Sequence, residues 1–203
     1  MPRLFGSPGD PSWQATTDMP SALVVALHLR DAADLDVRPD VIVPRLHPSV
    51  IRDGALEPYA TARATAAWTP WWDGLLERGQ EFRIAPQLAP DPAADLPEDL
   101  RALIAAGLPA ANAWFAARKR EDIEFIRHAG RPRMPNVVEV VKEVEQELGR
   151  RAAPFDLLIS ILPVTGMWAR RVRRDHVLVS RELSGFDAGF EAFLEPVVRE
   201  LAR

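Results

Sequence analysis

The chain has 203 residues, of which 47% are hydrophobic and 27% charged, and its formal net charge is −4. These values are typical of a soluble globular protein with a real core. Because the sequence contains no cysteine, disulfide bonds, thiolate metal sites and cysteine nucleophiles are excluded. No apolar run reaches the roughly 18 residues that a membrane span needs, so we expect a cytoplasmic protein without a membrane partner.

The first part of the chain predicts an arm followed by strands. Residues 1–20 contain several prolines and glycines and predict an irregular N-terminal arm, with a single domain over residues 21–203. The stretch "SALVVALHLR" (21–30) is dense in apolar and β-branched residues, which predicts a buried strand. A second strand is predicted at 41–50, where Pro44 requires an edge position or a bulge.

Helices and a loop are predicted next. Residues 55–68 favour a helix, and Thr69-Pro70 indicates the cap and first position of a new, short helix that ends at Gly79. A short strand is expected at 81–85. The segment 86–99, with four prolines and four acidic residues, predicts a surface loop or linker.

The middle of the chain predicts three helices. The first covers 97–106 and ends at Gly107, and the second covers 109–128. The third is capped by Asn136 and ends at Gly149. It has an apolar stripe of Val137, Val140, Val141, Val144 and Leu148.

The C-terminal part predicts a strand, a hairpin and a helix. Residues 155–164 are apolar on both faces and predict an interior strand. Two further strands are expected on either side of a tight turn at Arg173–Asp175. The final stretch has the spacing of one helix face, through Phe190, Phe193, Leu194, Val197, Val198 and Leu201. Pro196 lies inside this pattern and predicts a kink or break.

These elements together predict an α+β fold. Strands near both ends of the chain, with helices between them, favour a single mixed or antiparallel sheet of about five strands. We expect the helices to pack mainly on one face of that sheet.

The arginine-rich hairpin "ARRVRRDH" (169–176) is the first candidate site. Strand alternation predicts that Trp168 shares the packed face with Arg170, whereas Arg171 and Arg173 point into solvent and Arg174 lies in the turn. Exposed Arg171, Arg173 and Arg174 are candidates for binding phosphates or an acidic protein partner. The alternative is a solvated hairpin without a ligand.

The tryptophans of "WTPWWDG" are the second candidate. Neighbouring helix positions point about 100° apart, so Trp71 and Trp72 cannot both face one point of the core. We expect one of these indoles to be uncovered. Trp68, Trp71 and Trp72 are therefore candidates for a small-ligand pocket or an interface, and a homodimer through Trp71 or Trp72 is predicted. The alternative is that these indoles pack in the core or beneath the N-terminal arm.

Two histidines on predicted strands, His28 and His47, are alternative acid/base candidates. With nearby acids they suit a hydrolase, with or without a metal, but no HExxH, GxSxG or phosphate-binding glycine loop occurs. Structural histidines are the competing interpretation. We expect no cofactor and no stoichiometric transition metal.

The sequence therefore favours an interaction or small-ligand-binding protein that self-associates, without a catalytic signature. A hydrolase using His28 and His47 is one alternative. Phosphate or nucleic-acid binding through the hairpin arginines is another, and the net acidic charge disfavours nucleic acid.

Overall fold

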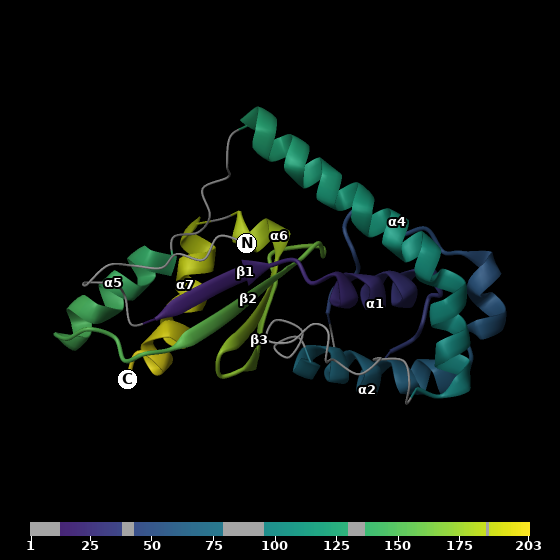
Figure 1. Ribbon diagram of the computed structural model, residues 1–203, viewed down its shortest axis with the longest axis horizontal. Coiled ribbons are helices and arrows are strands. Elements are labelled where there is room, and N and C mark those ends of the chain that lie inside the picture. Colours follow the sequence, from purple (N-terminus) through teal and green to yellow (C-terminus); the bar gives the residue numbers. More distant parts are fainter. Residues whose placement is uncertain (1–12, 38–42, 79–95, 130–136, 186) are drawn as a thin grey trace. The chain divides into compact units, whose positions relative to one another are not determined.

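The computed structural model describes residues 13–37, 43–78, 96–129, 137–185 and 187–203 (Figure 1). The predicted strand at 81–85, most of the loop at 86–99 and the Asn136 cap lie outside these residues. Within them the fold is α+β, as predicted, with a single mixed sheet of four strands rather than about five.

The chain forms two compact units. Unit 1 contains the described residues of Met1–Asp18, Arg133–Ile161 and Met167–Arg203, and unit 2 contains those of Met19–Pro132 and Leu162–Gly166. The expectation of one domain over residues 21–203 stays a prediction.

Unit 1 is built around the sheet, whose strand order is β1-β2-β4-β3. Strand β1 (Gln14–Asp18) runs parallel to β2 (Asp156–Leu162), and β3 (Ala169–Arg173) is antiparallel to β4 (His176–Ser180). The interior strand at 155–164 and the hairpin are thus confirmed, whereas the irregular arm is wrong for residues 14–18. The polar sequence "QATTD" gives no strand signal of its own and is ordered by pairing with β2.

Helices α5 (Val137–Leu148) and α7 (Asp187–Leu201) cover one face of this sheet, and the short α6 (Arg181–Ser184) follows β4 (Figure 1). Their apolar stripes meet Leu157, Ile159, Val177 and Val179 in one core. Helix α5 ends at Gly149, whose φ of 64° is left-handed, as predicted. Helix α7 continues through Pro196, so the predicted break is wrong, and the buried residues on both sides of the proline stabilise the continuous helix.

Unit 2 consists of α1 (Ser21–Ala32), the 3₁₀ helix η2 (Gly54–Tyr59), α2 (Ala62–Arg78) and α4 (Glu98–Ala129). The predicted strand at 21–30 is wrong because this segment is helix α1, in which every residue from Leu23 to Ala32 is buried. A helix that is buried on all sides shows no amphipathic period. The predicted strand at 41–50 is also wrong within the described residues, where it contributes only an isolated bridge between Leu46 and Val164.

Two prolines lie inside helices of unit 2. Pro70 is inside α2 and Pro109 inside α4, so the helix boundaries predicted at Thr69 and Gly107 are wrong. A proline inside a helix costs about 3 kcal/mol, and here tertiary packing of the neighbouring residues offsets that cost. The stretch Glu98–Glu121 of α4 is long and apolar enough, by length and composition only, to cross a membrane. One such helix is by itself weak evidence of a membrane span, and 22% of its apolar window is buried inside the structure.

A buried ion pair joins α1 to the following loop. The Arg30 guanidinium donates to the Asp31 carboxylate (2.7 Å) and to the carbonyl oxygens of Val43 (2.6 Å) and Pro44 (2.9 Å). The same carboxylate accepts the backbone N–H of Leu46 at 2.8 Å. Arg30 and Asp31 are 3% and 5% exposed, so their charges are satisfied by each other and by the loop backbone.

Loss of the Asp31 charge should destabilise the protein strongly. We expect Asp31→Asn to lower the free energy of unfolding by about 3–5 kcal/mol, because it leaves the Arg30 charge buried without its partner. Asp34→Asn is the matched control, since its carboxylate is half-exposed in the ion pair with Arg45 and should contribute less than about 1 kcal/mol. Urea unfolding followed by tryptophan fluorescence measures both, and equal losses would contradict the prediction.

Helices α1 and α4 approach closely at Gly107. A Cβ atom at this position would overlap Cδ2 of Leu29 and come within 3.3 Å of Leu56. Leu29 is fully buried and has little room to move. Gly107 therefore permits the close approach of the two helices because it has no side chain. It does not end the helix, contrary to the sequence prediction.

Gly107→Ala should therefore destabilise the protein by about 1–3 kcal/mol, because overpacking outweighs the gain in helix propensity. Gly54→Ala is the control, because a Cβ atom there meets nothing within 4 Å. Chemical denaturation of the two variants tests the difference. A Gly107 variant as stable as the unmodified chain would show that the helices can separate without cost.

Candidate functional site

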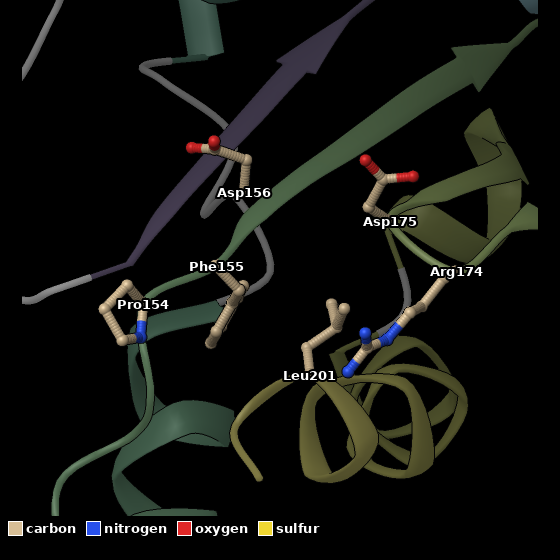
Figure 2. Close-up of a pocket in the computed structure, with 6 residues that line it drawn as sticks. All are labelled: Pro154, Phe155, Asp156, Arg174, Asp175 and Leu201. Carbon is tan, nitrogen blue, oxygen red and sulfur yellow. The ribbon is translucent and has the colours of Figure 1, made fainter.

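The candidate site is an open pocket of about 480 Å³ in unit 1 (Figure 2). It lies where β2 begins, beside the β3–β4 turn and the end of α7. Its lining consists of Pro154, Phe155, Asp156, Arg174, Asp175 and Leu201. The pocket combines an apolar floor with two carboxylates and one guanidinium, a composition that suits a small polar ligand.

Backbone hydrogen bonds position the lining residues. The carbonyl of Phe155 accepts the N–H of Gln14 (2.8 Å), and the carbonyl of Asp175 accepts the N–H of Leu158 (2.8 Å). The Phe155 ring is stacked on Trp13, with ring centroids 5.9 Å apart. The start of β2 is therefore joined to β1 on one side and to the turn on the other.

Arg171 braces the turn beside the pocket. Its Nε donates to the carbonyls of Arg173 and Arg174 at 3.1 Å, and its Nη2 donates to Arg174 at 2.6 Å. Its Nη1 donates to the Glu200 carboxylate at 2.6 Å. The sequence makes the Arg171 guanidinium a candidate phosphate ligand, but most of its N–H donors already form hydrogen bonds within the fold.

The predicted side-chain faces of the hairpin are wrong. Ala169 packs against the core under α5 and α7, and Arg171 shares its face, with a side chain only 27% exposed. Arg173 is half-buried, Arg170 is exposed and Trp168 is only half-buried. The apolar stem of Arg171 therefore lies on the packed face of the hairpin. Its guanidinium reaches backbone carbonyls and Glu200.

Glu200 further reduces the positive field of the hairpin. The hydrogen bond from Arg171 lowers the pKa of Glu200 below its ordinary value, and the charges of Arg171, Arg174 and Arg203 act in the same direction. Arg174 contacts Glu200 through Nε (3.6 Å to the carboxylate) and Nη2 (3.5 Å to the carbonyl). Both contacts are long, and its Nη1 has no partner among the described residues.

The tryptophan cluster is not open to solvent. Trp68, Trp71 and Trp72 are 0%, 7% and 1% exposed, so the expectation of an uncovered indole is wrong for the single chain. Because α2 is continuous, Trp68 and Trp72 lie one turn apart and stack at 5.4 Å, and Trp68 Nε1 donates to the carbonyl of Ala26. The homodimer stays a prediction.

The two candidate histidines differ in their surroundings. His28 is 6% exposed in α1, with its ring 5.9 Å from that of Trp114 in α4. Its Nδ1 has no hydrogen-bond partner among the described residues. His47 is exposed, and no described interaction joins it to His28. Within the described residues no three histidine, aspartate or glutamate side chains gather in a way that could hold a metal.

Comparison of the chain with family models, curated proteins and solved structures gave no match.

Sequence reasoning missed a buried polar cluster in the sheet. Ser160 Oγ donates to Asp18 Oδ1 (3.2 Å) and lies 3.0 Å from Nε2 of His176. Ser160 and His176 are 2% and 1% exposed. A polar residue in the middle of "FDLLISILPV" was the available signal, because buried hydroxyls need partners.

This cluster ties three strands together rather than forming a nucleophile. In acyl transfer the histidine takes the proton from the serine and is oriented by the carboxylate. Here the serine lies between the two other groups, with its Oγ 3.2 Å from Asp18 and 3.0 Å from His176. The cluster is buried, and its geometry supports a structural role.

Burial of His28 makes stability depend on pH. Desolvation lowers the pKa of His28, outweighing the raising effects of Asp31 and Asp53. Because the unfolded state then binds the proton more readily, stability should fall as pH drops through about 6.5 toward the folded-state pKa. We expect His28→Phe to remove this part of the pH dependence and His47→Asn to leave it unchanged. Denaturation at a series of pH values measures it, and an unaltered slope in His28→Phe would refute the assignment.

Proposed function

We propose that this chain is a cytoplasmic small-ligand-binding protein and that the pocket at the start of β2 is its binding site. The observation that carries the proposal is the lining itself, which combines three charged residues, Asp156, Asp175 and Arg174, with apolar ones that include Phe155 and Leu201. In Figure 2 the Arg174 side chain extends toward Leu201, and the two carboxylates point away from it. The pocket volume lies within the usual range for small-molecule sites, about 300–1,000 Å³.

Two charged side chains of the pocket, Asp156 and Arg174, are available at little structural cost. Asp156 is exposed, and its side chain makes no hydrogen bond or ion pair among the described residues. Arg174 keeps Nη1 free, as described above. Residues that hold the fold together, such as Arg171, lie behind the lining rather than in it.

The hairpin arginines support phosphate or nucleic-acid binding less well. Of the three candidates, Arg171 is engaged by Glu200 and two carbonyls, and Arg174 faces the same glutamate. A polyanion approaching Arg174 would also meet Asp156 and Asp175. The hydrolase alternative stays a prediction that no described contact between His28 and His47 supports.

Protein-observed NMR tests the proposed site. The ¹⁵N-labelled chain is titrated with a library of small polar fragments. We expect hits to shift the backbone amides of Phe155, Asp156, Arg174 and Asp175. Asp156→Lys should abolish most of these hits, because it reverses a charge at the pocket wall, whereas the matched Asp73→Lys in α2 should not.

Two outcomes would refute the proposed site. One is a library without any hit at millimolar concentration. The other is a set of hits whose shifts lie elsewhere and persist in Asp156→Lys.

A further inference from the structure

We propose that the outer edge of strand β3 binds an acidic, extended segment of another protein, which pairs with β3 as an added strand. This inference goes beyond the proposed function and does not depend on it, because it concerns the edge of the sheet and not the pocket at the start of β2. It follows from the backbone groups that β4 leaves unused and from two arginines that lie beside them on one face.

The backbone of β3 offers hydrogen-bonding groups on its outer side. Strand β3 is the last strand of the described sheet, and no described strand pairs with its outer edge (Figure 1). The carbonyl of Trp168 accepts the N–H of Ser180 at 2.7 Å, so these residues form a hydrogen-bonded pair. Such pairs alternate along an antiparallel ladder, and the next one contains Arg170. The N–H and C=O groups of Ala169 and Arg171 therefore point away from β4.

A β-bulge places two arginines on the same face at this edge. Arg170 lies opposite Leu178 of β4 and, beyond a register shift, Arg173 lies opposite His176. Residues opposite each other in a ladder point to the same face, and residues two positions apart in one strand share a face. Arg170 and Arg173 therefore share a face as well. Without the extra residue of the bulge they would point to opposite faces.

The side chains of these two arginines are available to a partner. Arg170 is exposed and Arg173 is half-buried, and within the described parts of the chain neither guanidinium has a hydrogen bond or an ion pair. The Glu200 carboxylate is paired with Arg171, whose side chain points to the opposite face. Two positive charges therefore remain on one face beside the unused backbone groups.

This arrangement specifies the pattern of the partner sequence. Arg170 and Arg173 span the same length as two residues of β4, so acidic residues two positions apart in an extended partner would both face them. The intervening residues of the partner point to the other face. There Ala169 packs against the core under α5 and α7, and apolar residues suit those positions.

A second copy of the chain fits this edge less well. Pairing of two β3 edges would bring arginines toward arginines, and like charges opposite each other destabilise a strand pair. The other edge strand, β1, contains a single acidic residue, Asp18, whose carboxylate accepts a hydrogen bond from Ser160. The charges that repel another β3 edge attract an acidic strand, so we assign the edge to an acidic partner.

Three capped heptapeptides test the proposed partner. The peptide TVEVEVT has glutamates two positions apart, and TVVEEVT has the same composition but adjacent glutamates, which point to opposite faces of a strand. The peptide TVKVKVT reverses the charges. Dissociation constants come from NMR titration of the full ¹⁵N-labelled chain. We expect TVEVEVT to bind about tenfold more tightly than TVKVKVT, and more tightly than TVVEEVT, because only TVEVEVT pairs both arginines.

Amide hydrogen exchange separates strand addition from charge attraction alone. At about 90% occupancy by TVEVEVT, exchange of the Ala169 and Arg171 amides should slow by about tenfold, because they gain hydrogen bonds and only the free fraction exchanges. The Arg170 amide, which already bonds to β4, should change little. Binding that leaves exchange at Ala169 and Arg171 unchanged would overturn the inference.

A charge-reversed variant tests the two arginines. In the double variant Arg170→Glu and Arg173→Glu, TVKVKVT should bind about tenfold more tightly than TVEVEVT. Arg63→Glu, at an exposed position of α2 outside the sheet, controls for net charge and should keep the original order of affinities. Thermal unfolding verifies that each variant is folded. If the double variant does not fold, the three peptides on the unmodified chain decide the question.

Four further results would overturn the inference. The first is no binding of TVEVEVT at millimolar concentration, and the second is equal affinity for TVEVEVT and TVVEEVT. Tighter binding of a short oligothymidylate, lost in the double variant, would assign the arginines to nucleic acid. A dimer in which the Ala169 and Arg171 amides exchange slowly without peptide would assign the edge to a second copy. None of these results involves the amides of Phe155 and Asp156, so the proposed function is tested separately.

Discussion

The position of the pocket depends on one arginine that is not part of its lining. Arg171 bonds to the carbonyls of Arg173 and Arg174 and to the Glu200 side chain, and so fixes the β3–β4 turn against the end of α7. The turn presents Arg174 and Asp175 to the start of β2. Without this brace the two charged groups would sit on an unsupported bend, because the register of the hairpin already shifts between Arg171 and Arg173.

In unit 2 another arginine also bonds to backbone carbonyls, at a more deeply buried position. Arg30 donates to two loop carbonyls while paired with Asp31, and Asp31 accepts a backbone N–H in return. In both units a guanidinium, which has five donors, bonds to backbone carbonyls of a loop or turn. These arginines stabilise the paths of loops, and this role leaves fewer of the chain's positive charges for an external partner.

The sequence correctly predicts elements that are buried on one side only, or whose ends carry a residue typical of a helix or strand end. Helix α5 has a clear stripe and a terminal glycine, and β2 is a short apolar run. Helix α1 was mistaken for a strand because it is buried all round. The sequence predicts a boundary within each of the helices α2 and α4, because a proline is a local signal for a helix end. The tertiary packing that keeps each helix continuous involves residues far away in the sequence.

The site was less predictable than the fold. The sequence makes Arg174 a candidate, but the pocket lining comes from three separate segments, and no local pattern brings Asp156 or Leu201 to Arg174. The hydrogen bonds among Asp18, Ser160 and His176 were missed for the same reason. The sequence predicts the wrong face for Arg171 because it treats arginine as a polar residue. The long apolar stem of this side chain can pack like that of an apolar residue.

The pairing of β1 with β2 has a consequence for how the chain folds. Asp18 and Ser160 meet although 142 positions separate them, and most of unit 2 lies between them in sequence. Closing so long a loop costs entropy before any contact forms, which slows folding. During synthesis the residues of β1 leave the ribosome long before β2 exists. The edge of β2 that receives β1 stays open until the N-terminal strand returns, and in that interval it can pair with the strand of another nascent chain.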